Sequence, residues 1–425
     1  MTLSLFDLAA LFLSLSAVIG WLNVKLLRLP TGVAMLLVGL ASTLTLVGVN
    51  RLAPGMGIDR TVGEVVRQVD FSAAVLRFML AYLLFAGAMH VNLEALKQRA
   101  WTAAVLATVG VIVSAGVIGG GFWLAARGIG VPLTFAWALV FGVLISPTDP
   151  VGVLATLKRT SLVADIRALI EGEALFNDGV GVVLFGAALT LASSGGAIAP
   201  LPLAGQVLLQ GGGGGALGLL LGLAAIRAMR SIDDYAVEVG ITLALATGVY
   251  ALAQALNLSG PIAVVVAGLM CGRRSVREAM SEQTRRYTRA FWTIVDENLN
   301  GVLFLLVGLE VFTLKFDRLV DLLAAAAIPL ILLGRWASLA GPATVLSAID
   351  GGVKPGLVVV LTWAGVRGGL SVAMALSLPP SRERVIILAA TYVVVVFSII
   401  VQSLTLERVV VRMGYGRAAQ TGSGG

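Results

Sequence analysis

Long apolar blocks separated by short polar segments run along the chain. A helix needs roughly 20 apolar residues to cross a bilayer, and by this criterion we count about 13 blocks. They lie near residues 3–22, 31–49, 71–89, 102–126, 134–157, 166–191, 204–226, 235–256, 259–272, 291–313, 319–348, 356–378 and 385–410. The pattern predicts an all-α, polytopic membrane protein without a separate soluble domain.

The same pattern predicts one transmembrane domain over residues 1–413 and a flexible Gly/Ser-rich tail over 414–425. Two repeat halves are expected, at about 1–203 and 235–413. The segment from Met1 to Ala17 has neither a basic start nor a small-residue cleavage site. We therefore expect it to be a first spanning helix that stays in the mature protein.

Composition supports a membrane location. The chain is 58% hydrophobic and 12% charged, whereas soluble domains are about 25% charged. The formal charge is +7, but the basic residues are scattered between apolar blocks and form no surface for nucleic acid. Most Lys and Arg fall on one side of the bilayer if the N-terminus is outside, which predicts a cytoplasmic C-terminus.

Polar residues interrupt the fifth apolar block at Ser146-Pro147-Thr148-Asp149-Pro150. Two prolines flank Thr148 and Asp149, remove backbone donors and must break a helix there. Backbone freed in this way is tolerated at membrane depth only where it lines a cavity. The motif predicts an ion site in a broken helix.

Three carboxylates lie within eight residues of the sixth block, at Glu171, Glu173 and Asp178. They cannot all be charged in lipid without partners or water. At about 100° per residue, Glu171, Ala174 and Asp178 share one helix face, whereas Glu173 and Asn177 share a neighbouring face. Different faces suggest different roles.

A second interrupted helix is expected in the twelfth block, where Gly365, Gly368 and Gly369 surround Arg367. Corresponding breaks in two halves are typical of inverted-repeat transporters. Arg367 needs an anion, and Glu173 is the natural candidate for a structural salt bridge, because either charge alone would be costly. Arg335 is then the one intramembrane cation left for Asp149 and Asp178, so an exchangeable cation or proton is expected to supply the missing charge.

These motifs carry a family resemblance. From about Leu84 to Val410 the chain resembles the monovalent cation/proton antiporters of the NhaP type, relatives of the animal sodium/proton exchangers. In that family a Thr-Asp in a broken helix, an Asn-Asp on the next helix and a Gly-x-Arg-Gly in a later broken helix build the site. The matching residues are Thr148-Asp149, Asn177-Asp178 and Gly365-Val366-Arg367-Gly368.

The resemblance implies roles for single residues. Asp178 would bind the cation or the proton, with Asp149 and Thr148 as further ligands of a monovalent cation. Asn177 would hold the crossing of the two broken helices, and Glu173 would pair with Arg367. Glu171 and Arg335 are expected as accessory residues.

The resemblance also implies a function and a setting. It implies electroneutral exchange of Na⁺ for H⁺ by a homodimer in the cytoplasmic membrane, serving pH and Na⁺ homeostasis, with no enzymatic activity and no cofactor. Ala174 and Ala86 replace a serine and an acidic residue found in many relatives, so oxygen ligands are fewer and selectivity among Na⁺, Li⁺ and K⁺ is left open. A K⁺/H⁺ antiporter and an intramembrane hydrolase are the alternatives.

Two polar groups near the cytoplasmic side have two interpretations each. His90, the single histidine, is either a pH sensor or an interfacial cap. Asp296 and Glu297 either attract cations to a vestibule or cap the start of the tenth span.

Overall fold

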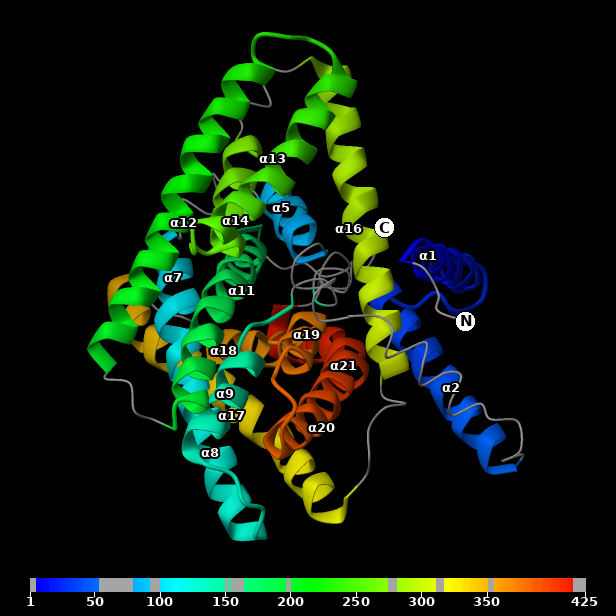
Figure 1. Cartoon of the computed structure of the whole chain (residues 1–425), viewed down its shortest axis with the longest axis vertical. Helices are drawn as coiled ribbons and strands as arrows, with labels where there is room; N and C mark the ends of the chain where they lie inside the picture. The colour runs from blue at the N-terminus through cyan, green and yellow to red at the C-terminus, as the bar shows by residue number, and fades with distance from the viewer. Residues whose placement is uncertain are drawn as a thin grey trace, which may run out of the picture.

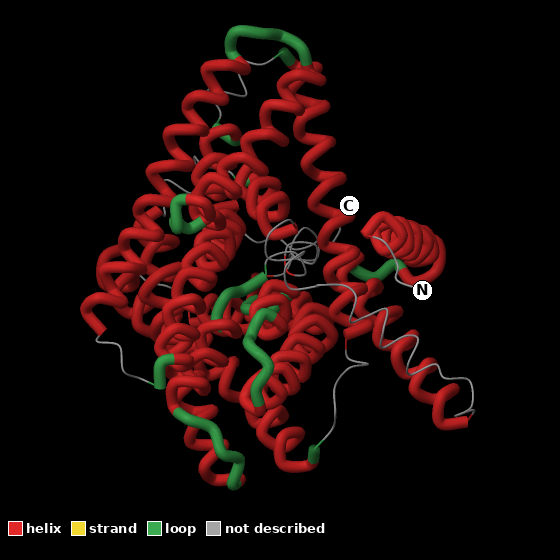
Figure 2. The backbone as a smooth tube through the Cα atoms, viewed as in Figure 1, coloured by secondary structure: helices red, strands yellow, loops and turns green. Residues whose placement is uncertain are grey.

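Helices joined by short loops make up the part of the chain that the structure describes (Figure 2). The structure, a computed structural model, describes residues 5–52, 79–91, 100–149, 153, 164–195, 200–273, 281–310, 317–350 and 355–415. The longer helices are α1 (Leu5–Leu22), α2 (Thr31–Leu52), α8 (Val111–Ile129), α11 (Ala164–Ser193), α12 (Pro200–Met229), α13 (Tyr235–Ala255), α16 (Glu282–Glu310), α17 (Arg318–Asp350) and α20 (Arg382–Phe397).

Shorter helices and wide π-helical turns complete the described chain. The helices are α5 (Leu80–His90), α7 (Ala100–Val105), α9 (Phe135–Ile145), α14 (Gly260–Cys271), α18 (Pro355–Trp363), α19 (Gly369–Leu376) and α21 (Ser403–Val410). The π-helical turns are η1 (Asn23–Leu27), η4 (Leu106–Gly110), η6 (Ser398–Gln402) and η7 (Val411–Tyr415).

Membrane-spanning character is confirmed for much of the chain. Among the described residues, eight helical segments are long and apolar enough to cross a bilayer. Others, such as α5, α9 and α14, are apolar but shorter. The expected number of about 13 spans stays a prediction, as does the division into repeat halves. The flexible tail over 414–425 also stays a prediction, since its residues after Tyr415 lie outside the described ranges.

Helix starts follow from local chemistry. The Thr134 hydroxyl accepts a hydrogen bond from the Trp137 N–H at the start of α9. The Asp234 carboxylate accepts from two backbone N–H groups at the start of α13, and the Ser259 hydroxyl accepts from the Ile262 N–H at the start of α14. Each cap satisfies a donor that has no partner within its helix.

Both expected helix breaks are present. Helix α9 ends at Ile145, immediately before Ser146 and Pro147. Helix α18 ends at Trp363, and α19 begins at Gly369 after five non-helical residues. Of the residues that follow Asp149, 150–152 and 154–163 are outside the described ranges.

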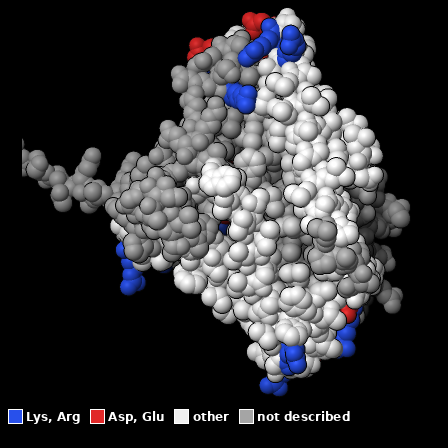
Figure 3. Space-filling view, turned by 90° about the vertical axis from the view of Figure 1, so that its left-hand side faces the viewer, with Lys and Arg blue, Asp and Glu red and all other residues white. Residues whose placement is uncertain are grey.

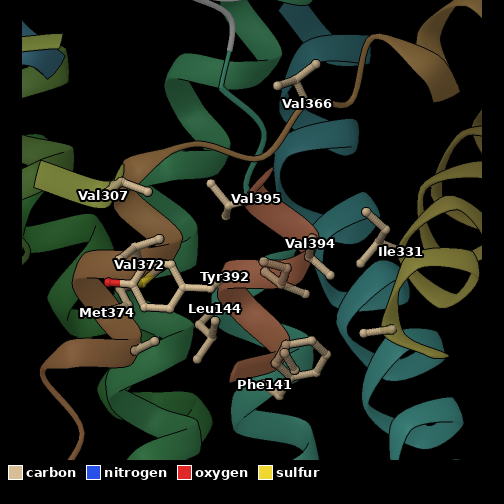
Figure 4. Packing of buried hydrophobic residues seen from close by; sticks show 14 of the residues in the cluster. Phe141, Leu144, Val307, Ile331, Val366, Val372, Met374, Tyr392, Val394 and Val395 are labelled. Carbon is tan, nitrogen blue, oxygen red and sulfur yellow. The ribbon is translucent and has the colours of Figure 1, made fainter. Parts of the chain in front are cut away.

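The helices pack into two groups. One buried cluster joins α8, α9, α17, α19, α20 and the C-terminal half of α16, and a second joins α5, α12, α13, α14 and the N-terminal half of α16 (Figure 1). In the first, Phe141 and Leu144 of α9 lie among Val372 of α19 and Val394 of α20 (Figure 4). Val182 of α11 packs against both clusters, so α11 lies between the groups.

Exposed charged side chains are scarce in the middle of the visible surface. On the face in Figure 3, most visible Lys, Arg, Asp and Glu side chains gather toward the two ends, with a broad uncharged region between them. A bilayer requires such a distribution, because charged groups are costly at membrane depth. The fold therefore matches the expected all-α membrane class.

Two expectations about α16 need correction. Asp296 and Glu297 do not cap a helix start, because α16 begins at Glu282, more than three turns earlier. The tenth apolar block was expected near residues 291–313, but α16 already begins at Glu282 and carries Arg285 in its first turn. The apolar pattern hid this start, since polar first turns resemble a loop.

Glycines bring α12 and α14 into close contact. A Cβ atom at Gly218 would lie 2.1 Å from the Ala263 carbonyl oxygen, and one at Gly214 would lie 2.5 Å from the Ser259 carbonyl oxygen. Small residues allow membrane helices to approach closely where no hydrophobic effect drives association. Gly218, and Gly214 within the glycine run from Gly211 to Gly215, therefore serve helix packing.

We expect Gly218→Ala to destabilise the protein by about 1–3 kcal/mol, the usual cost of forcing extra volume into a packed interface. Gly212→Ala is the control, because a Cβ at Gly212 meets nothing within 4 Å. The melting temperature of the detergent-solubilised protein measures both. Equal melting temperatures for the two variants would contradict the packing role of Gly218.

Candidate functional site

The first broken helix is anchored to α11 through the amide of Asn177. The Asn177 Nδ2 donates to the Thr148 hydroxyl at 2.9 Å, and the Thr148 N–H donates to the Asn177 Oδ1 at 3.4 Å. Both residues are buried. The Asn177 side chain thus supplies a donor and an acceptor to the non-helical segment that contains Thr148.

Pro147 also rests on α11. A Cβ atom at Gly181 would lie 2.3 Å from Pro147 Cγ, so a glycine is needed where the proline ring meets the helix. One turn separates Gly181 from Asn177 along α11. The broken segment therefore lies along one side of the helix that carries Asp178.

The two broken helices meet at Asp149. Its backbone N–H donates to the Val366 carbonyl at 2.8 Å. A Cβ atom at Gly368 would lie 2.1 Å from Asp149 Oδ2, so the carboxylate sits against the glycine backbone. The expected approach of residues 148–149 to residues 365–368 is therefore present.

Arg367 is fully buried and binds the end of α9. Its Nη1 donates to the carbonyl oxygens of Ser146 and Pro147, the second at 3.1 Å. Carbonyls at a helix C-terminus have no partner in the helix and carry partial negative charge. Arg367 therefore stabilises the break in α9.

The predicted salt bridge between Glu173 and Arg367 is wrong. Arg335 of α17 holds Glu173 through two parallel bonds, Nη1 to Oε1 and Nη2 to Oε2, the second at 2.8 Å. Both side chains are buried, and a bidentate pair offsets much of the desolvation cost of two charges. Two intramembrane arginines were available to Glu173, and spacing along the chain could not choose between them.

Arg335 has a second role at the other broken helix. Its Nε donates to the Leu361 carbonyl of α18 at 3.3 Å. A Cβ atom at Gly365 would lie 2.9 Å from Arg335 Cγ, so glycine makes room for the arginine stem. Glu173, Arg335 and Arg367 lie near enough for their charges to interact, which makes this a compact charge network around the break.

Asp178 is placed differently from Glu173. It is partly buried, and no hydrogen bond or salt bridge to its carboxylate is present within the described chain. Its negative charge and that of Asp149 lie close enough to repel each other. Two such carboxylates favour a bound proton or cation between them. Of Glu171, the expected accessory residue, the structure describes the backbone and not the side chain.

The alanines at two expected ligand positions are buried. Ala86 and Ala174 are 0% and 1% exposed, and their methyl side chains contribute no oxygen ligand. His90 ends α5, where its Nδ1 lies 2.6 Å from the Ala86 carbonyl oxygen and its Nε2 lies 3.1 Å from the Thr293 hydroxyl of α16. The first contact lies within α5, the second joins α5 to α16, and both fit the cap interpretation.

The sequence analysis missed Gln402. This residue is fully buried in the last helical segment and donates to the Trp363 carbonyl at the end of α18. An amide in the middle of an apolar block was the available signal, because buried polar groups require partners.

Two sodium/proton antiporters are similar to the chain over almost its whole length. The chain is 39% identical to the Na⁺/H⁺ antiporter NhaP of Pseudomonas aeruginosa, over 98% of this chain and 99% of that protein. It is 34% identical to the Na⁺/H⁺ antiporter NhaH of Halobacillus aidingensis, over 92% and 93% of the two chains.

A solved structure shares the fold. The sodium proton antiporter MjNhaP1 of Methanocaldococcus jannaschii superposes with a TM-score of 0.73 at 20% identity, covering 95% of this chain and 97% of that one. The family model for the sodium/hydrogen exchanger transmembrane region matches residues 13–412. The protein therefore belongs to the sodium/hydrogen exchanger family.

Proposed function

We propose that this protein exchanges Na⁺ for H⁺ across the cytoplasmic membrane, with Asp178 as the carrier of either ion. The observation that carries the proposal is a partly buried carboxylate without a hydrogen bond or salt bridge in the described chain, facing the charge of Asp149. Burial disfavours the charged form of an isolated carboxylate. The site is therefore neutralised by a proton or by a cation, and competition between the two is the basis of exchange.

Neighbouring residues have distinct parts in this proposal. Thr148 and Asp149 supply oxygen atoms beside Asp178, and Asn177 holds their segment in place. Glu173, Arg335 and Arg367 fix the broken helices and take no part in carrying the ion. If the site can switch its opening from one side of the membrane to the other only when a proton or a cation is bound, a proton gradient moves the cation in the opposite direction.

The relatives' names favour Na⁺ over K⁺ as the cation. One carboxylate that carries either one cation or one proton also makes the exchange electroneutral. We further propose a homodimer with the N-terminus outside and the C-terminus in the cytoplasm, in keeping with the distribution of Lys and Arg. Its role would be in pH and Na⁺ homeostasis.

Purified protein in liposomes with a pH-sensitive dye inside tests the function. We expect Na⁺ added outside to move protons outward from an acidic lumen, and clamping the membrane potential to leave the initial rate unchanged. Li⁺ and K⁺ are titrated separately. A response to K⁺ alone would establish the alternative cation, and no response to any of the three would overturn the proposal.

A further inference from the structure

The end of helix α18 has a complete set of hydrogen-bond partners. The last four carbonyl oxygens of any helix lack partners within it. In α18, backbone N–H groups satisfy two of them, at Val360 from Ala364 and at Thr362 from Gly365. Side chains satisfy the other two. Arg335 Nε binds the Leu361 oxygen at 3.3 Å, and Gln402 Nε2 binds the Trp363 oxygen at 3.2 Å.

The Gln402 amide is held in one orientation. Its Oε1 accepts a hydrogen bond from the Ser398 hydroxyl, which leaves the NH₂ group directed at the Trp363 carbonyl. Ser398 and Gln402 are both fully buried. They begin and end η6, a π-helical turn that interrupts the last long helix, and π-helical turns frequently occur at functional sites.

Trp363 is held by hydrogen bonds to its backbone and to its side chain. Its carbonyl accepts from Gln402, and its indole Nε1 donates to the Thr405 hydroxyl at 2.9 Å. Gln402 and Thr405 are three residues apart and lie on one face of the last helical segment. Trp363 is also the last residue of α18, so these bonds set where the chain leaves the helix.

The five residues that follow Trp363 form the non-helical segment between α18 and α19, and this segment contacts the candidate ion site. They include Val366, whose carbonyl binds the Asp149 N–H, Arg367, which binds the end of α9, and the non-helical Gly368 against the Asp149 carboxylate. A change in the position of Trp363 is therefore transmitted along a short, covalently continuous segment to Asp149. Small misplacements of groups at a functional site can have large effects on rate.

We propose that Gln402 is a positioning residue for ion exchange, which holds the Trp363 carbonyl so that residues 364–368 keep Asp149 in the geometry that binds the cation. This role rests on the proposed Na⁺/H⁺ exchange. Gln402 does not touch the ion and acts through the broken helix.

Gln402→Met tests the role, because methionine has a similar length and cannot donate to the carbonyl. We expect the KM for Na⁺ to rise about tenfold and the pH profile of exchange to shift, because protons and Na⁺ compete for the same carboxylates. Gln254→Met is the matched control. Gln254 donates to the Tyr250 hydroxyl on α13, away from the broken helices, and its replacement should leave both quantities unchanged.

Gln402→Glu separates positioning from a purely structural role. A protonated glutamic acid can donate to the Trp363 carbonyl, whereas a carboxylate cannot. The ratio of variant to native KM should therefore be near one at low pH and increase as pH rises. Hydrogen exchange of backbone amides in residues 361–370 should increase in Gln402→Met and not in Gln254→Met.

The outcomes separate this inference from the proposed function. If the native protein exchanges no cation, the proposed function fails. If the native protein exchanges Na⁺ and Gln402→Met keeps its KM and pH profile, the positioning role is overturned. Should Gln402→Met fail to fold, Ser398→Ala decides, because it frees the Gln402 amide to rotate. An increased KM would support positioning, and an unchanged KM would overturn it.

Discussion

Asp178→Asn is expected to abolish Na⁺-dependent proton movement and leave the protein folded. Asparagine is almost the same size as aspartate but cannot ionise at any working pH, so it can neither release a proton nor neutralise a cation. Because no hydrogen bond or salt bridge to Asp178 is present in the described chain, the substitution breaks no described contact. The initial rate in dye-loaded liposomes should match that of empty liposomes.

The matched control is Asp317→Asn. The Asp317 carboxylate caps the start of α17 by accepting from the Leu319 N–H at 3.0 Å, and asparagine caps helices equally well. Exchange should therefore be unchanged. A cation-dependent pH change that persists in Asp178→Asn, in protein that elutes as one symmetric peak, would remove Asp178 from the role of carrier.

Breaking the ion pair of Glu173 and Arg335 is expected to destabilise the protein far more than removing the pair. Glu173→Gln or Arg335→Met alone leaves one buried charge without its partner, which costs about 3–5 kcal/mol. The double variant removes both charges of the pair and should recover most of that loss. It still lacks the bond from Arg335 to the Leu361 carbonyl, worth about 1 kcal/mol, so recovery should be incomplete.

The melting temperature of solubilised protein and the yield of monodisperse protein measure this effect. Glu173→Gln combined with Arg367→Met is the informative control, because Arg367 binds carbonyl oxygens at the end of α9 and not Glu173. It should be less stable than Glu173→Gln alone. Recovery by Arg367→Met in place of Arg335→Met would instead show that Glu173 pairs with Arg367.

Much of the fold could be predicted because a lipid environment restricts spanning helices to mostly apolar residues. Segments of about 20 apolar residues mark spans whatever their partners are. The two breaks could be located because proline and glycine act locally, at Pro147 and at Gly365 and Gly368. The start of α16 could not, since its first turns project beyond the apolar region and carry the polar residues of an ordinary loop.

The residues of the candidate site could be predicted, but which of them contact each other could be predicted only in part. Asn177 and Thr148 contact each other as the resemblance implied. The partner of Glu173 depended on how α17 packs against α11, which is a property of three-dimensional packing and not of spacing along either helix. The partner of Gln402 could not be predicted for the same reason, because it is a backbone carbonyl 39 residues away that any amino acid would present.

The bond between the Asp149 N–H and the Val366 carbonyl joins the two broken helices through their main chains. The donor and the acceptor both belong to the peptide backbone, so a substitution of the side chain at position 366 leaves this hydrogen bond in place. Sequence conservation and alanine scanning therefore do not report on it. If one broken helix tilts during transport, this hydrogen bond couples the other to it, and the two broken helices would move together as one rigid body.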